Sequence, residues 1–100
     1  MLYIVYIAID QDIAPEWEAW MTQTHIPDVL HTQAFESAVL ARDPNADQAT
    51  RRAYRAIYLA KDEQALTHYQ HHHAPALQAE HTERYAGRFE AHREILGRVP

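Results

Sequence analysis

Near its start the chain carries an uninterrupted apolar stretch, LYIVYIAI at residues 2–9, and this stretch decides the fold. Successive side chains of a β-strand point to opposite sides of the sheet, so a strand of this composition has two apolar faces. Both faces must be shielded from water. The helices of a 100-residue chain can cover one face, and we expect a second copy of the chain to cover the other.

Two later regions show the periodicity of amphipathic helices. In the first, Pro15 suits the opening turn, and Trp17 lies on the apolar face, where we expect it to anchor the core. Pro27 should bend or end this helix, because proline interrupts regular helical hydrogen bonding. In the second region, Asp62 can cap the first turn, and Pro75 should kink the helix or begin a new one.

Alternating patterns predict three further strands. In the first of them the alternation places Phe35 and Val39 on one face and leaves the strand half polar. The turn-forming residues 43–47 should join it to the next strand as a hairpin. The three predicted strands are Ala34–Arg42, Arg52–Ala60 and Phe89–Leu96.

The resulting order, β-α-β-β-α-β, is the ferredoxin-like arrangement. Its first and third strands are central, and its second and fourth strands lie at the edges. Here the first and third strands have two apolar faces and the other two are half polar, so burial and topology agree. We therefore predict one α+β domain over residues 1–100, with a four-stranded antiparallel sheet and helices on one face.

The composition excludes several classes of function. A formal net charge of −5 disfavours nucleic acid and anionic membranes as partners. The absence of cysteine excludes disulfides, thiolate catalysis and Cys-ligated zinc. With only two glycines there is no phosphate-binding loop, so we expect no cofactor. No stretch approaches the ~20 apolar residues of a membrane span, and no signal peptide is evident, so we expect a cytoplasmic protein.

The first helical region contains a distinctive pair of tryptophans followed by a His-Ile-Pro sequence, EWEAWMTQTHIPDV at residues 16–29. It resembles the EWxxWMxxxHIPxV motif of a small family described as a domain of unknown function. The resemblance extends over residues 1–97 and departs from the family at Gln78, where members often carry Arg. The family is similar to the dimeric α+β barrel superfamily, in which two ferredoxin-like subunits pack sheet on sheet. That superfamily includes monooxygenases, haem-degrading enzymes and isomerases, so the fold alone does not specify a reaction.

Histidines are the densest set of candidate functional groups. Helical periodicity turns His25, His73 and His81 toward the sheet. They are either hydrogen-bonded core residues or the lining of a cleft between helices and sheet, where a histidine could act as an acid or base near neutral pH. We take them as candidate ligand-binding residues.

An arginine lies on an apolar strand face. Arg93 alternates with Phe89 on the inner side of the last strand. A guanidinium on such a face needs a partner, because burying it unpaired is costly. The partner is either an acid, with Glu80, Glu83, Glu36 or a residue of a second copy as candidates, or the carboxylate of a small ligand.

A second group of histidines, His68, His71 and His72, lies on the exposed face of the second helical region. The i, i+3, i+4 spacing can hold a divalent metal ion such as zinc. The same spacing is also typical of a solvated polar face that binds metal only adventitiously.

Three functions remain open from these patterns. The first is a homodimeric α+β barrel protein, paired through the sheet face, that binds a small molecule in the helix–sheet cleft. The second is a cofactor-independent monooxygenase or isomerase that uses His25, His73 or His81 as acid or base. The third is a histidine-rich metal-binding module.

Overall fold

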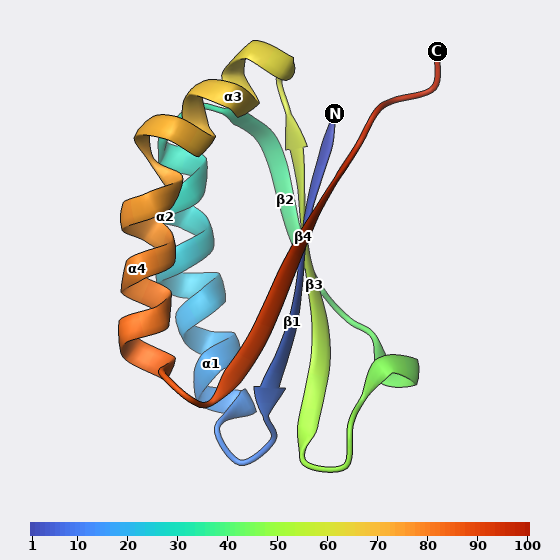
Figure 1. The fold of residues 1–100 in the computed structure, drawn as a ribbon, viewed down its shortest axis with the longest axis vertical. Helices are drawn as coiled ribbons and strands as arrows, with labels where there is room; N and C mark the ends of the chain where they lie inside the picture. Colours follow the sequence, from blue (N-terminus) through green and yellow to red (C-terminus); the bar gives the residue numbers. More distant parts are fainter.

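The two-sided apolar strand lies in the middle of a four-stranded antiparallel sheet. The computed structural model describes residues 1–100, and its sheet has the order β2-β3-β1-β4. The helices lie together on one side of this sheet (Figure 1). The predicted α+β, ferredoxin-like βαββαβ fold is confirmed. The strands are β1 (Leu2–Asp10), β2 (Phe35–Arg42), β3 (Arg51–Ala60) and β4 (Phe89–Leu96).

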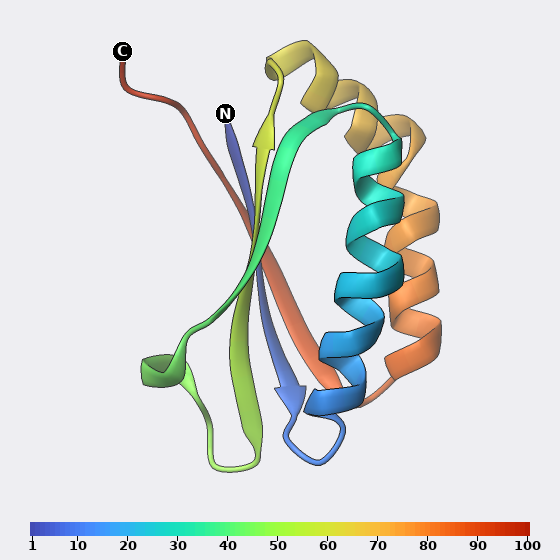
Figure 2. The ribbon, with the colours of Figure 1, turned by 180° about the vertical axis from the view of Figure 1, so that it is seen from behind.

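A single layer of two helical stretches covers the inner face of the sheet (Figure 1, Figure 2). They are formed by α1 (Ala14–Trp20), η1 (Met21–His25), α2 (Ile26–His31), α3 (Glu63–His72) and α4 (Ala74–Tyr85). The hairpin between β2 and β3, which contains the 3-10 turn η2 (Pro44–Ala46), extends on the opposite side of the sheet (Figure 2). None of these helices combines the length and the apolar character that crossing a membrane would require.

The first helical region does not end at Pro27. Helical structure continues from α1 through η1 and α2 to His31. The segment η1 is a π-helix, in which the Ile26 N–H donates to the Met21 carbonyl. This wider turn accommodates a proline that would clash in a regular α-helix. Of the two expected outcomes, a bend or an end, the end does not occur. Pro75 does begin a new helix, α4, and the Asp62 side chain caps α3 by accepting the Ala65 N–H at 2.7 Å.

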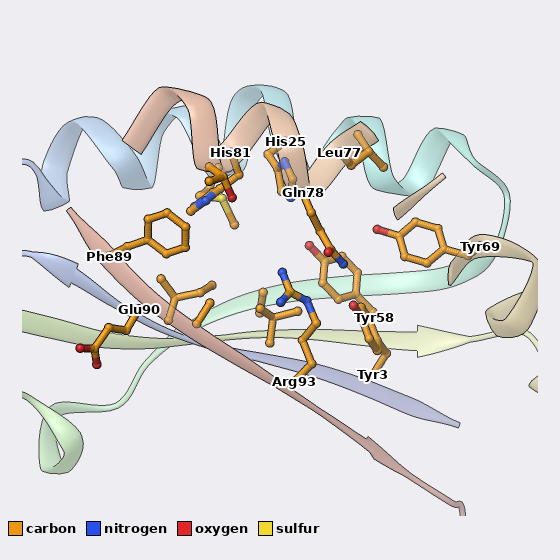
Figure 3. A pocket seen from close by; sticks show the side chains of 16 residues that line it. Tyr3, His25, Tyr58, Tyr69, Leu77, Gln78, His81, Phe89, Glu90 and Arg93 are labelled. Carbon is orange, nitrogen blue, oxygen red and sulfur yellow. The ribbon is translucent and has the colours of Figure 1, made fainter. Parts of the chain in front are cut away.

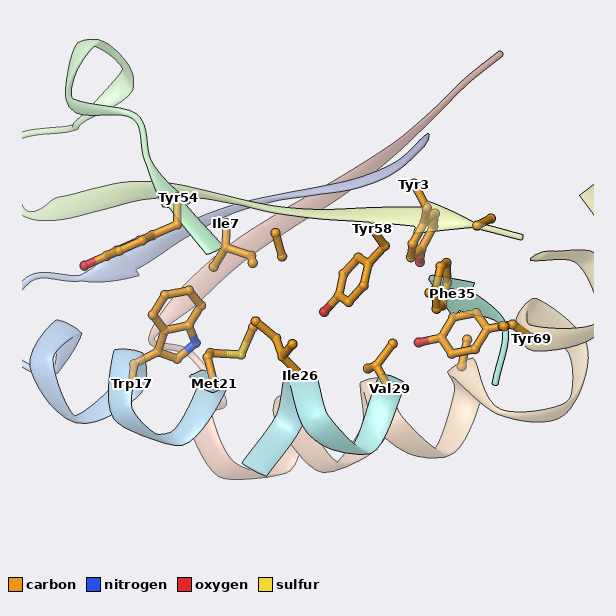
Figure 4. Packing of buried hydrophobic residues seen from close by; sticks show 14 of the residues in the cluster. Tyr3, Ile7, Trp17, Met21, Ile26, Val29, Phe35, Tyr54, Tyr58 and Tyr69 are labelled. Atoms are coloured by element: carbon orange, nitrogen blue, oxygen red, sulfur yellow. The ribbon is translucent and has the colours of Figure 1, made fainter. Parts of the chain in front are cut away.

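The core lies between the inner face of the sheet and the helices (Figure 4). Trp17 is completely buried in it, with its ring centroid 4.7 Å from that of Tyr54. At the other end, Phe35 packs against Tyr58 and Tyr69, with ring centroids 5.1 and 4.9 Å apart. The expectation that Trp17 anchors the core is confirmed.

The outer face of the sheet has no helix over it. Residues that pair directly across antiparallel strands lie on the same face. Ile4 pairs with Ile57, and Ile57 pairs with Val39, which is 54% exposed. Val5 instead pairs with Ala56 and Arg93 and faces the helices. The central strand therefore has one face in the core of its own chain and one face open.

Candidate functional site

A pocket of about 200 Å³ opens between the inner face of the sheet and the helices (Figure 3). It has 16 lining residues, ten of them hydrophobic, which come from β1, η1, β3, α3, α4 and β4. Segments distant in sequence thus form one concave surface. A mostly apolar pocket with a few polar groups is typical of small-molecule sites.

One end of the pocket contains a hydrogen-bonded tryptophan–histidine pair. The Trp17 Nε1–H donates to His81 Nε2 at 2.9 Å, and both residues are buried. Because Nε2 accepts this bond, the proton of the neutral ring resides on Nδ1. Burial, with repulsion from His25 and Arg93, lowers the pKa of His81 to about 4. His81 is therefore a neutral imidazole at pH 7.

Beside this pair lies His25, at the end of the π-helical segment. Its ring stacks on Trp20, with centroids 5.1 Å apart, and stands edge-on to His81 at 5.9 Å. Burial lowers the pKa of His25, although Asp28 opposes the shift. His25 Nδ1 is buried without a hydrogen-bond partner, and such an atom costs roughly 1–3 kcal/mol. This nitrogen has almost no exposed surface, so the pocket is in contact with other atoms of the His25 ring.

The other end of the pocket is formed by tyrosines. The ring centroid of Tyr3 lies 6.0 Å from that of Tyr58 and 6.1 Å from that of Tyr69. No hydroxyl of these three tyrosines forms a hydrogen bond within the chain, and all three residues line the pocket. Burial raises the pKa of Tyr58 and of Tyr69, so both phenols stay protonated and able to donate.

Between the two ends, Arg93 projects from β4 into the pocket (Figure 3). Its guanidinium forms no ion pair or hydrogen bond within the chain, so the expected pairing with Glu80, Glu83 or Glu36 does not occur. The one carboxylate that lines the pocket, Glu90, lies 3.3 Å from Arg51.

The structure brings together three of the four residues expected to share a cleft. His25, His81 and Arg93 line the pocket, but His73 does not. The His73 ring lies 5.6 Å from His68, at the junction of α3 and α4. The backbone departs from helical geometry at His73, with φ −122° and ψ −41°, because Pro75 begins a new helix. The helical phase used to turn His73 toward the sheet is therefore broken at this residue.

Sequence reasoning missed the tyrosines. Tyr3 and Tyr58 alternate with apolar residues on the inner faces of central strands, and this pattern is typical of core packing. One signal in the sequence could have identified them. A buried phenol needs a hydrogen-bond partner, and the chain offers few acceptors on that face.

The outer histidines form no metal centre. His68, His71 and His72 are exposed on α3, and the His68 and His72 rings lie 4.3 Å apart. No group of three or more His, Asp or Glu side chains is placed to hold a metal ion. The structure therefore does not single these histidines out as a site, and their binding of metal, adventitious or not, stays a prediction.

The fold resembles solved structures at low sequence identity. HapK from Hahella chejuensis has a TM-score of 0.64 at 16% identity, covering 100% of this chain and 97% of that one. SnoaB, a cofactor-independent oxygenase from Streptomyces nogalater, has a TM-score of 0.63 at 17% identity, covering 98% and 94%. An ethyl tert-butyl ether d (ethd) family protein from Bacillus halodurans has a TM-score of 0.62 at 11% identity, covering 97% and 100%. At these identities the likeness establishes the fold alone.

Comparison of the sequence with known proteins identifies its family. It matches none of the curated proteins. It does match a family model described as a domain of unknown function (DUF4286), and the match spans residues 1–99. This span includes the tryptophan pair and the His-Ile-Pro sequence that suggested such a relationship. The chain belongs to the DUF4286 family.

Proposed function

We propose that the protein is a homodimer that binds a small organic molecule in the pocket between the sheet and the helices. The observation that carries the proposal is a largely apolar pocket whose wall contains polar groups with no partner in the chain, namely the Arg93 guanidinium and the tyrosine hydroxyls. A sealed core would satisfy or exclude such groups, whereas a binding site leaves them for its ligand.

The dimensions of the pocket limit the ligand. A buried cavity of about 150 Å³ in another protein accepts benzene, so a pocket of about 200 Å³ fits a molecule of one or two rings. At one end of the pocket the rings of His81 and Phe89 meet edge-on, with centroids 4.5 Å apart. An aromatic ligand can pack against these rings, so a flat ligand is favoured.

The open sheet face supports the homodimer. Two sheets packed face to face about 10 Å apart would remove Ile57 and Val39 from water in both copies. Charged groups on this face already have partners: Arg55 pairs with Asp43 at 2.8 Å, and the Tyr6 hydroxyl donates to Glu94 at 2.6 Å. Their burial is therefore less costly than the burial of unpaired groups would be.

Calorimetric titration with 2-naphthamide, 2-naphthoate and their one-ring analogues tests the binding site. We expect at least one of these compounds to bind. Ala91 lines the pocket, so Ala91→Phe should fill it and weaken binding more than tenfold. Ala79→Phe, on the exposed side of α4, is the matched control and should bind as the original chain does. Binding by none of the compounds, or unchanged binding by Ala91→Phe, would contradict the proposal.

His25 favours a second candidate function, a cofactor-independent oxygenase or isomerase. A neutral imidazole at pH 7 can take a proton from a bound carbon acid, and both reaction types can begin with that step. The structural likeness to SnoaB supports this at the level of the fold only. The test is deuterium exchange into 1,3-dihydroxynaphthalene in D₂O, followed by NMR. The protein should accelerate exchange over buffer, His25→Gln should abolish the acceleration, and exposed His68→Gln should keep it. Equal rates with and without protein would exclude this function for that carbon acid.

A further inference from the structure

Three of the eight arginines, Arg52, Arg93 and Arg98, have no carboxylate partner, and of these only Arg93 lines the pocket. Five others pair with carboxylates, namely Arg42, Arg51, Arg55, Arg84 and Arg88. Arg93 has no such partner although it lies on the inner face of β4, directly opposite Val5. Arg93 is exposed to solvent in the free chain, so a ligand that covers it must offset the loss of its hydration, and an anionic group does so.

No acid of the protein can supply that anion. Glu94, the next residue, points to the outer face and accepts the Tyr6 hydroxyl. Glu90 lies at the far end of the pocket and pairs with Arg51 (Figure 3). A second copy packed on the outer face would approach the opposite side of the sheet from Arg93. The charge is therefore left for a molecule that enters the pocket.

Neutral hydrogen-bond donors surround the guanidinium. In Figure 3 the side chains of Tyr58, Tyr69 and Gln78 reach toward the same part of the pocket as Arg93. The two phenols have no acceptor within the chain, and an O–H donor stabilises a carboxylate more than a neutral group. The two histidines at the other end are uncharged at pH 7, so Arg93 alone sets the sign of the preferred ligand.

We propose that the pocket takes a small aromatic carboxylate, with its anionic group on Arg93 and the hydroxyls of Tyr58 and Tyr69, and its ring against Phe89 and His25. This inference rests on the proposed function of the pocket. One guanidinium matches the two oxygens of a carboxylate bidentately. A phosphate dianion would require a second cation, and the pocket lining contains no other Lys or Arg.

The test compares two probes of equal shape, 2-naphthoate and 2-naphthamide, by calorimetric titration at pH 7. The original chain should bind the carboxylate at least tenfold more tightly than the amide. Arg93→Gln should lose this preference while it still binds the amide, which shows that the pocket remains folded. Arg98→Gln makes the same change of charge outside the pocket and should keep the preference.

The outcomes separate this inference from the proposal beneath it. If the amide binds as tightly as the carboxylate, or if Arg93→Gln retains the preference, the carboxylate assignment is wrong and the binding pocket stands. If neither probe nor its one-ring analogue binds, both proposals fail. Tyr58→Phe and Tyr69→Phe should each weaken naphthoate binding several-fold and leave naphthamide binding unchanged, and the reverse pattern would remove the tyrosines from the anion site.

Discussion

The bond between Trp17 and His81 links the core to the pocket at the level of single residues. The indole holds Nε2 of the imidazole, so His81 must remain neutral to accept the bond. This requirement and burial act in the same direction on the pKa of His81. A structural contact therefore also fixes which nitrogen of His81 carries a proton beside the candidate ligand.

The first prediction concerns pH. The pKa of His81 is about 4 in the folded chain and ~6.5 when unfolded, so between these values only the unfolded state gains the proton. Stability should therefore be complete above about pH 6.5 and fall as pH drops toward 4, by roughly 3 kcal/mol at 1.36 kcal/mol per pKa unit. Urea unfolding between pH 7 and 4 measures this. His81→Gln, which keeps an acceptor for Trp17, should lose less stability on acidification than the original chain. Exposed His68→Gln should match the original chain, and identical curves for all three would contradict the assignment.

The second prediction concerns the donor of the same hydrogen bond, the indole N–H of Trp17. Trp17→Phe keeps an aromatic ring but removes the N–H donor and leaves His81 Nε2 buried without a partner. Together with the lost ring volume, we expect a loss of about 2–4 kcal/mol in the free energy of unfolding. Trp20→Phe is the matched control, because Trp20 forms no hydrogen bond through its indole, and it should lose less. Urea unfolding that ranks Trp20→Phe as the more damaging change would contradict this interpretation.

Helical periodicity was a good guide to single residues wherever the helix was continuous. Trp17, His25 and His81 all lie on the side it predicted. It failed at His73, where the chain changes from one helix to the next. The unpaired state of Arg93 could not be read from the sequence, because it depends on where several distant glutamates end up in three dimensions.

At the scale of elements, local irregularities decide which side chains reach the core. The register of β2 shifts between Phe35 and Ser37, where strict alternation predicts a regular strand. The irregularity allows Phe35 to enter the core while Val39 lies on the outer face, so the prediction that they share a face is wrong. Neither this shift nor the π-helical η1 has a clear signal in the sequence, whereas element order and the two central strands did.

The third prediction tests the cap of α3. Asp62 accepts the Ala65 N–H, and removing an N-cap acceptor costs about 1 kcal/mol. Asp62→Ala should lower the free energy of unfolding by that amount, as measured by urea unfolding. Asp62→Asn retains an acceptor and should recover most of the loss. Equal loss in both variants would show that charge rather than capping is responsible.

The fourth prediction concerns the outer side of the same helix. His68, His71 and His72 are exposed, so replacing all three by Gln should change stability by less than roughly 0.5 kcal/mol. Zinc should change the melting temperature of the triple variant and of the original chain by the same amount, because no group of metal ligands is assembled there. Cooperative loss of folding in this variant would mean that the histidines support the structure.

At the scale of the whole molecule, the sheet leaves one apolar face uncovered. Its members from the four strands include Tyr6, Val39, Ile57, Leu59 and Leu96. Monomeric proteins rarely expose apolar patches of more than a few hundred Å². A two-fold axis places identical patches against each other, which suits an isologous dimer. Obligate interfaces of this kind commonly bury about 2,000 Å² or more.

The last prediction follows from that face. If pairing of the sheets supplies much of the stability, folding and dimerisation are coupled, and the melting temperature should rise with protein concentration. Val5 faces the helices, so Ile57, near the centre of the open face, is the residue that tests the interface. Ile57→Asp should give aggregated or unfolded protein, because each copy would bury an unpaired carboxylate. Ala79→Asp, on the exposed side of α4, should remain a folded dimer by sedimentation. A folded monomer whose sedimentation does not change with concentration, observed for the original chain, would overturn the assembly. That result would leave the proposal of a binding pocket unchanged, because the pocket lies on the other side of the sheet and its walls belong to one copy.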